Sequence, residues 1–238
     1  MAMDTGRKKI VALTGAGMSA ESGISTFRDS NGLWEQYRVE DVASIEGWIR
    51  NPKLVLDFYN ARRASYKGCE PNEGHRLLAG LEKEYEVVVV TQNVDDLHER
   101  AGSTNIIHLH GELMKNCSDG HRETVFDVDP DNPELHLGDL APDGTQLRPY
   151  IVWFGEAVPK ITDAAREIET ADIVLVIGTS LNVYPAAGLL AYAPSSAPVY
   201  LIDPKPVSSS YRSDIHKITA GASEGMRLFC EELKKTER

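Results

Sequence analysis

The sequence has few cysteines, no excess of positive charge and no long apolar run. Its three cysteines, Cys69, Cys117 and Cys230, are scattered and odd in number, which argues against a disulfide framework and fits a reducing compartment. No apolar stretch approaches the length needed to cross a bilayer, and the N-terminal positive charges have no apolar region behind them. A net charge of −11 argues against a surface that binds nucleic acid. We therefore expect a cytoplasmic protein that binds neither nucleic acid nor membranes.

Short apolar runs of strand length recur along the 238 residues. They are rich in β-branched residues, and most are separated by stretches long enough to hold a helix. The runs are Ile10–Leu13, Val87–Val90, Ile106–Leu109, Ile173–Ile177 and Val199–Ile202. This pattern is typical of a parallel sheet covered by helices on both faces, so it predicts the α/β class.

Two stretches interrupt the alternation of strands and helices. Residues 33–74 look helical, and residues 113–150 are rich in Asp, Gly and Pro. We expect them to form a small inserted module. The remaining residues, 1–32, 75–112 and 151–238, would then form one discontinuous, Rossmann-like domain that binds a dinucleotide.

A glycine-rich turn, residues 15–24, follows directly on the first apolar run. It has the form G-x-G-x-x-A, which is typical of dinucleotide sites but also occurs in simple turns. We expect Gly15 to adopt a positive φ and Gly17 to let a pyrophosphate approach the backbone. An ordinary dehydrogenase would continue into a helix and a second strand that ends in an acidic residue. Here the polar, non-periodic residues 25–34 predict a loop folded over the cofactor.

Three of the apolar runs end in polar or glycine-containing segments. These segments are Thr91-Gln92-Asn93-Val94-Asp95, His110-Gly111-Glu112 and Gly178-Thr179-Ser180. Ligands of open α/β sheets bind at the carboxyl ends of the strands. The sequence therefore predicts that these segments surround one site.

Taken in order, the motifs resemble those of the sirtuins, the NAD-dependent protein lysine deacylases. The resemblance extends from about residue 8 to residue 228. It rests on Gly15-Ala16-Gly17-Met18-Ser19, Ser22-Gly23-Ile24, Phe27-Arg28, Thr91-Gln92-Asn93-Val94-Asp95, Leu97-His98, Ala101-Gly102, His108-Leu109-His110-Gly111, Val152-Trp153-Phe154-Gly155-Glu156, Gly178-Thr179-Ser180 and Pro185-Ala186-Ala187. Any one of these motifs would be weak alone, but their order is specific.

The resemblance implies a reaction in which the acyl oxygen of an acyl-lysine attacks the ribose of NAD. Nicotinamide leaves, and the products are free lysine and an O-acyl-ADP-ribose. His110 matches the catalytic histidine of the family, and an imidazole with a pKa near neutrality suits a base over the ribose. We expect His98 and His108 to be structural histidines.

The resemblance also implies NAD as the cofactor and a role for several residues around it. Asp95 would accept from the nicotinamide carboxamide, Asn93 would order the ribose or a water, and Gln92 would bind the ribose. Asn93 and Asp95 could equally cap the helix that follows. Phe27 and Arg28 resemble the loop that shields the ribose from water. The other residues implied to bind NAD are Gly15, Ala16, Gly17, Ser19, Gly178, Thr179, Ser180, Asp203 and Ala222.

Substrate selection is implied by two further segments. The edge segment Val152, Trp153, Phe154, Gly155 and Glu156 resembles the one that pairs with the substrate backbone. Tyr59 and Arg62 are spaced i, i+3, so a helix would place both on one face. Sirtuins that prefer succinyl- or malonyl-lysine carry such a Tyr-x-x-Arg to bind the acyl carboxylate. Ala43 matches a small residue that widens the pocket in the same class, which supports a longer acyl chain. The alternative is an ordinary helix surface with an exposed Arg and a core-facing Tyr.

The sequence departs from the family at the structural zinc site. Most sirtuins hold zinc with four cysteines in residues equivalent to 113–150, but this stretch has Cys117 alone, with Asp119 and His121 nearby. One thiolate does not make a tetrahedral site. We expect the chain to fold without zinc.

Other functions remain as alternatives to a desuccinylase. A Rossmann oxidoreductase would need a ribose-binding acid at the end of its second strand and gives no role to His110. A non-catalytic sensor of NAD or ADP-ribose would be expected to lack His110 or Asn93, and both are present. A sirtuin that acts mainly as a deacetylase or an ADP-ribosyltransferase is the closest alternative.

Overall fold

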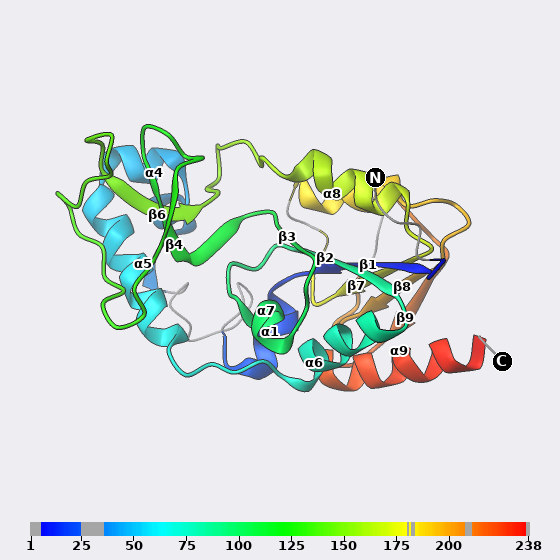
Figure 1. Cartoon of the computed structure of the whole chain (residues 1–238). Helices are drawn as coiled ribbons and strands as arrows, with labels where there is room; N and C mark the ends of the chain where they lie inside the picture. Colours follow the sequence, from blue (N-terminus) through cyan, green and yellow to red (C-terminus); the bar gives the residue numbers. More distant parts are fainter. Residues whose placement is uncertain (1–5, 25–35, 180, 182–183, 208–210, 237–238) are drawn as a thin grey trace.

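The computed structural model describes residues 6–24, 36–179, 181, 184–207 and 211–236. Within these residues, a six-stranded sheet has the order β3-β2-β1-β7-β8-β9, and all neighbouring strands are parallel (Figure 1). Its strands are β1 (Lys9–Thr14), β2 (Glu86–Thr91), β3 (Ile106–His108), β7 (Ile173–Ile177), β8 (Val199–Ile202) and β9 (Ile215–Ile218). The predicted Rossmann-like α/β class is confirmed.

Helices cover both faces of the sheet because successive side chains of each strand point to opposite sides. Ile10 and Ala12 of β1 belong to one buried cluster, and Val11 and Leu13 belong to another. The covering helices are α6 (Glu73–Gly80) and α9 (Ala222–Thr236) on the first face, and α8 (Ile161–Glu169) and the 3-10 helix η3 (Ala186–Tyr192) on the second (Figure 1). Shorter helices connect these elements: α1 (Ala16–Ser19), η1 (Ala20–Ser22), η2 (Leu81–Lys83) and α7 (Leu97–Ala101).

A smaller module lies at one end of the sheet and is drawn at the left of Figure 1. Its three-stranded sheet has the order β5-β4-β6, with antiparallel pairing. Its elements are α3 (Val39–Val42), α4 (Ile45–Arg50), α5 (Pro52–Tyr66), β4 (Gly111–Ser118), β5 (Val125–Asp127) and β6 (Leu147–Ile151). Helix α6, which begins at Glu73, already packs on the large sheet.

The longest helix of the module, α5, has a well-defined start and a fixed orientation. Asn51 caps it by accepting from the Leu54 amide at 3.2 Å, and Pro52 occupies the first turn, where the missing N–H costs nothing. Buried Arg63 donates to the carbonyl oxygens of Leu113, at 2.9 Å, and Pro133, at 2.8 Å. These bonds connect α5 to β4 and to the loop between β5 and β6. They thereby fix which face of the helix is turned toward the large domain.

A buried ion pair between Arg148 and Glu156 holds the centre of the module. The guanidinium donates to both carboxylate oxygens, at 2.9 and 3.0 Å, and its Cζ lies 3.5 Å from the ring centroid of Trp153. Glu156 also accepts from the backbone N–H of Trp153 at 2.8 Å, and Trp48 packs against the same indole. The side chains of the pair are 1% and 7% exposed, and each has a second, more exposed partner: Arg122 lies 3.1 Å from Glu156, and Asp119 lies 3.6 Å from Arg148.

Among the described residues, no helix is long and apolar enough to cross a membrane.

Replacing Arg148 by Met is expected to lower the free energy of unfolding by about 3 kcal/mol, the lower end for a broken buried ion pair, because Glu156 would lose both bonds from Arg148 and keep only its contact with the more exposed Arg122. Urea unfolding followed by tryptophan fluorescence measures the change. Arg166→Met is the matched control, since Arg166 is 72% exposed where it pairs with Asp163, and its loss should cost at most about 1 kcal/mol. Equal effects of the two substitutions would contradict the role given to the buried pair.

Candidate active site

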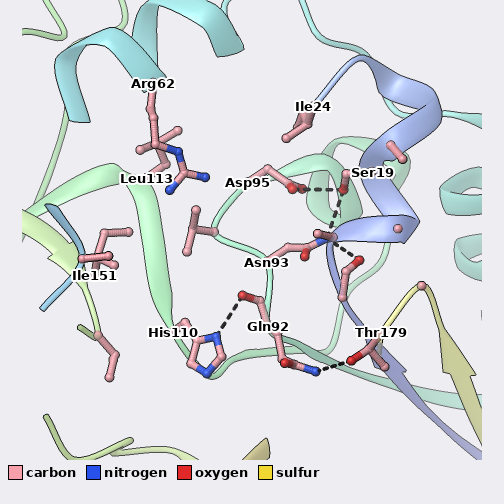
Figure 2. A pocket seen from close by; sticks show the side chains of 18 of the residues that line it. Ser19, Ile24, Arg62, Gln92, Asn93, Asp95, His110, Leu113, Ile151 and Thr179 are labelled. Carbon is pink, nitrogen blue, oxygen red and sulfur yellow. Dashed lines mark hydrogen bonds between the residues drawn. The ribbon is translucent and has the colours of Figure 1, made fainter. Parts of the chain in front are cut away.

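A cavity of about 890 Å³ lies where the carboxyl ends of the central strands face the small module (Figure 2). The predicted residues found in its lining come from eight segments of the chain. They are Gly15, Ala16, Gly17, Ser19, Ala43, Tyr59, Arg62, Gln92, Asn93, Asp95, His110, Val152, Trp153, Phe154, Gly155, Glu156, Gly178, Thr179 and Asp203. The structure therefore brings together residues that are up to 188 positions apart in sequence, from Gly15 to Asp203.

Four predicted residues are not placed in this lining. Phe27, Arg28 and Ser180 lie outside the described residues. Ala222 is buried at the start of α9, where it belongs to the core, and its neighbour Gly221 lines the cavity instead.

The glycine turn is shaped by its contact with the end of β7. The expected positive φ at Gly15 is wrong, since its φ is −133°. A Cβ on Gly15 would lie 2.8 Å from the Cβ of Thr179, and one on Gly17 would lie 2.6 Å from the Cα of Gly178. The amide of Gly17 donates to the Gly178 carbonyl at 2.8 Å. Close packing against the end of β7 therefore requires glycine at both positions, and the approach of a pyrophosphate to Gly17 stays a prediction.

Asn93 and Asp95 project from the loop between β2 and α7, and Ser19 connects them. The Asn93 side-chain amide donates to the Gly15 carbonyl and to Ser19 Oγ, both at 3.1 Å, and Ser19 Oγ donates to Asp95 at 3.0 Å (Figure 2). Asp95 also accepts from the amide of Leu97, the first residue of α7, at 3.2 Å, so it is bonded to the start of the helix and lines the cavity, although the N-cap position itself is Asp96. Burial raises the pKa of Asp95 above its usual range, and the bonds from Ser19 and Leu97 oppose that shift.

His110 is held in one tautomer by Gln92, the residue that follows β2. Its Nδ1 lies 3.1 Å from the Gln92 carbonyl, which can only accept, so Nδ1 carries the proton and Nε2 is left as an acceptor. Burial lowers the pKa of His110, and the bond to Gln92 opposes this in part. Gln92 is itself held by the Thr179 hydroxyl at 3.1 Å. A neutral imidazole with a free Nε2 is the state that a general base requires.

The other two histidines predicted to be structural lie in buried contacts. His98 Nε2 lies 3.0 Å from the Thr14 hydroxyl, and His108 Nε2 lies 2.7 Å from Glu99. Neither His98 nor His108 lines the cavity.

Tyr59 and Arg62 lie on the face of α5 that lines the cavity. The guanidinium of Arg62 reaches into the space between α5 and the loop that carries Asp95 (Figure 2). Its Cζ lies 5.8 Å from the ring centroid of Tyr59. The Tyr59 hydroxyl accepts from Trp153 Nε1 at 2.9 Å. Burial lowers the pKa of Arg62, although the nearby Tyr59 and Asp95 partly offset this effect.

The segment of residues 152–156 connects the two parts of the molecule. Val152 donates from its amide to the His110 carbonyl at 2.9 Å, and the amide and carbonyl of Phe154 bond to Ala43 and Ile45. The Phe154 side chain is 52% exposed at the cavity, whereas Trp153 is buried. The carboxylate of Glu156 accepts two hydrogen bonds from Arg148, an interaction that the sequence pattern did not indicate.

Lys205, which no sequence motif indicated, lines the cavity two residues beyond Asp203. The Lys205 amide donates to Asp203 at 2.8 Å, so both belong to the turn that ends β8. Its position after a parallel strand was the available signal. Among the described residues, no three His, Cys, Asp or Glu side chains gather so as to hold a metal ion.

Comparison with known families gives a match to the Sir2 family over residues 15–185. The chain belongs to the Sir2 family. It is 60% identical over 231 residues to an NAD-dependent protein deacylase of Bacteroides thetaiotaomicron, covering 96% of this chain and 97% of that protein. It is 50% identical over 220 residues to an NAD-dependent protein deacylase of Helicobacter pylori, covering 92% and 95%.

Solved structures of Sir2 homologues share the whole fold. A Sir2 homologue in complex with NAD has a TM-score of 0.85 and 37% identity, covering 97% of this chain and 91% of that one. A mutant homologue in complex with 2′-O-acetyl ADP-ribose has a TM-score of 0.84 and 37% identity, covering 97% and 93%. The predicted sirtuin family is therefore confirmed, and with it the prediction that the chain is an enzyme.

In this Sir2 chain, Gly17→Ala is expected to weaken NAD binding, measured by titration calorimetry, and to lower the free energy of unfolding by about 1–3 kcal/mol. The added methyl group would press on the Gly178 backbone, which has no side chain that could move away. Gly80→Ala is the control: its φ is −61°, and an added Cβ would meet nothing within 4 Å. Normal NAD affinity in Gly17→Ala would show that the turn tolerates the shift.

Proposed function

We propose that the chain is an NAD-dependent protein lysine deacylase that removes succinyl and malonyl groups, and also acetyl groups. The observation that carries the proposal is that the neutral His110 and the Tyr59–Arg62 pair line one cavity. The relatives from B. thetaiotaomicron and H. pylori, both named NAD-dependent protein deacylases, support the general activity. The choice of acyl group is an inference from the cavity.

The described residues fit a dinucleotide along the strand ends. Asp95 and Asn93 would hold the nicotinamide end, Gln92 the adjoining ribose, and Thr179 and Asp203 the adenosine side. The cavity volume of about 890 Å³ is within the range of sites for large ligands. When bound, NAD supplies the ribose that takes the acyl group and the nicotinamide that leaves.

His110 would act as the base at Nε2. Its Nδ1 proton is committed to the Gln92 carbonyl, so a proton taken from a ribose hydroxyl can go only to Nε2. The resulting charge would be stabilised by the same carbonyl. Because burial lowers the pKa of His110, the ring is neutral at pH 7 and ready to accept.

The polarity of the hydrogen bonds around Tyr59 favours an acceptor as its ligand. The Nε1 of Trp153 and the guanidinium of Arg62 can only donate hydrogen bonds. Neither neighbour can therefore accept the Tyr59 proton. Burial raises the pKa of Tyr59, which keeps that proton in place. A hydroxyl donor beside a guanidinium is complementary to a carboxylate, as found at the end of a succinyl or malonyl group.

We propose that the acyl-lysine enters between Ala43 and residues 152–156, with its peptide beside the exposed Phe154. The backbone N–H and C=O of Phe154 are already bonded to Ala43 and Ile45. A substrate strand would therefore pair with the neighbouring peptide groups.

We also propose that the module needs no zinc and that the protein acts in the cytoplasm. The Arg148–Glu156 pair and the tryptophan stack occupy the centre of the module. Adding a strong chelator to the urea unfolding experiment tests the first point, since the unfolding midpoint should not change.

His110→Ala is expected to lower the rate of NAD-dependent deacylation by about 10²–10⁴-fold while leaving NAD affinity within a few-fold of the original. Mass spectrometry of acyl-lysine peptides measures turnover, and calorimetry measures binding. Since burial lowers the pKa of His110, activity of the unchanged protein should fall as the pH drops through a value below about 6.5. Near-normal turnover in the variant would refute the assignment of the base.

Arg62→Met is expected to lower kcat/KM for succinyl-lysine by about 30-fold or more and to spare acetyl-lysine, which has no charge to pair. The assay compares acetyl, malonyl and succinyl forms of one peptide. Arg50→Met is the control, because Arg50 is an exposed arginine of the same module that pairs with Asp41. Equal losses on acetyl and succinyl peptides would mean that Arg62 supports the fold, and would favour a deacetylase.

A further inference from the structure

His108 and His110 are separated by one residue but lie in opposite hydrogen-bond environments. The Nδ1 of His108 lies 3.2 Å from the Asn93 carbonyl, and its Nε2 lies 2.7 Å from the Glu99 carboxylate. A carbonyl oxygen and an ionised carboxylate can act only as hydrogen-bond acceptors. Both ring nitrogens of His108 must therefore donate. This geometry requires an imidazolium at His108, whereas His110 has one such partner and is neutral.

Asn93, in the loop that lines the cavity, is held through its carbonyl, its amide and its side chain. The Asn93 amide donates to Thr91 Oγ1 at 3.0 Å, and its side chain is bonded to Gly15 and Ser19. The backbone conformation at Asn93 sets where the next side chains point, including that of Asp95. A hydrogen bond to the Asn93 carbonyl therefore helps to position the residues at the nicotinamide end of the proposed site.

Charged groups from three segments act on His108. Besides Glu99 on α7, the carboxylates of Glu112 on β4 and Asp95 in the loop attract its proton. His98 on α7 is buried nearby, and its pKa lies well below the usual value, so it carries no charge that would repel the imidazolium. Burial is the largest single effect and lowers the pKa of His108, but the hydrogen bond and charge of Glu99, the charge of Glu112 and the Asn93 carbonyl together outweigh it, so the net shift of the pKa is upward.

We propose that Glu99 and His108 form a positioning pair, in which the protonated His108 holds the Asn93 carbonyl and so presents Asn93 and Asp95 to the nicotinamide end of NAD. The role in turnover rests on the proposed deacylase function, but the role in placing the loop does not. Neither residue touches the cavity, so the pair acts through Asn93.

The proposal predicts the direction of a pH effect. Because the folded pKa of His108 is above its unfolded value, the stabilising bonds are fully present below about pH 6.5 and are lost as the pH rises through the folded pKa. A neutral ring has one N–H and can serve only one of its two acceptors. Its neutralisation also removes the positive charge that faces Asp95, Glu99 and Glu112. NAD affinity and turnover should therefore fall together on the alkaline side.

The test combines NMR titration of the His108 ring in the NAD-free protein with NAD affinity by calorimetry and kcat/KM as functions of pH. In the unchanged protein, the alkaline midpoints of affinity and turnover should coincide with the His108 midpoint. Glu99→Gln keeps the size of the side chain but removes its charge, so it should move all three midpoints down by about one pH unit or more. Glu99→Asp keeps the charge, so it should recover much of the difference in midpoints between Glu99→Gln and the unchanged protein.

Glu70→Gln is the matched control. Glu70 pairs with Arg100 on the same helix as Glu99 and is 71% exposed, so its neutralisation should leave every midpoint unchanged. Far-UV circular dichroism verifies that each variant is folded. If Glu99→Gln does not fold, the coincidence of midpoints in the unchanged protein and in Glu99→Asp decides the question.

The proposal is overturned if the His108 midpoint does not move in Glu99→Gln, or if it moves while the alkaline limb of NAD affinity stays in place. Glu70→Gln matching the effect of Glu99→Gln would also overturn it, because any nearby charge would then suffice. If the protein binds NAD with the expected pH dependence but removes no acyl group, the proposed function fails and the positioning pair stands.

Discussion

The contact between the glycine turn and the end of β7 is the constraint on which the site depends. The two backbones approach so closely that a single Cβ at Gly17 would lie 2.6 Å from the Cα of Gly178. This approach brings the loop after β1 within reach of the loops after β2 and β7. As a result, Asn93 can bond to Gly15, and Gln92 can bond to Thr179, without any side chain longer than an amide. A wider gap would separate Thr179 from the loop that carries Gln92, Asn93 and Asp95.

The sequence predicted the central strands because parallel strands buried on both faces must be almost uniformly apolar, as in Ile173–Ile177. Edge and module strands carry less of this signal. β9 is only four residues long and has two adjacent polar residues, His216 and Lys217, between Ile215 and Ile218, so the sequence does not indicate it. The strands of the module lie in a stretch rich in Asp and Gly. Their pairing is decided by contacts with distant residues, which no local pattern reports.

The site shows the same division between residue type and residue role. The order of the motifs indicated His110, Asn93 and Asp95, and the structure places all three in one cavity. The sequence did not indicate why particular residue types occur at some of these positions. Gly15 is required by the neighbouring strand end rather than by its own φ, and Glu156 bonds to Arg148, which is eight positions away in sequence. Such roles depend on which partner the fold brings near, and one sequence does not contain that information.

Trp153 belongs to the module core and to the proposed acyl pocket at the same time. One face of its indole stacks on the Arg148 guanidinium, while its N–H holds the Tyr59 hydroxyl. Arg148 is not among the residues that line the described cavity. A substitution there would still shift the indole and, through it, the hydroxyl that faces the acyl group. In such an arrangement the choice of substrate can drift during evolution through changes in the packing behind the pocket, while every residue that touches the substrate stays the same.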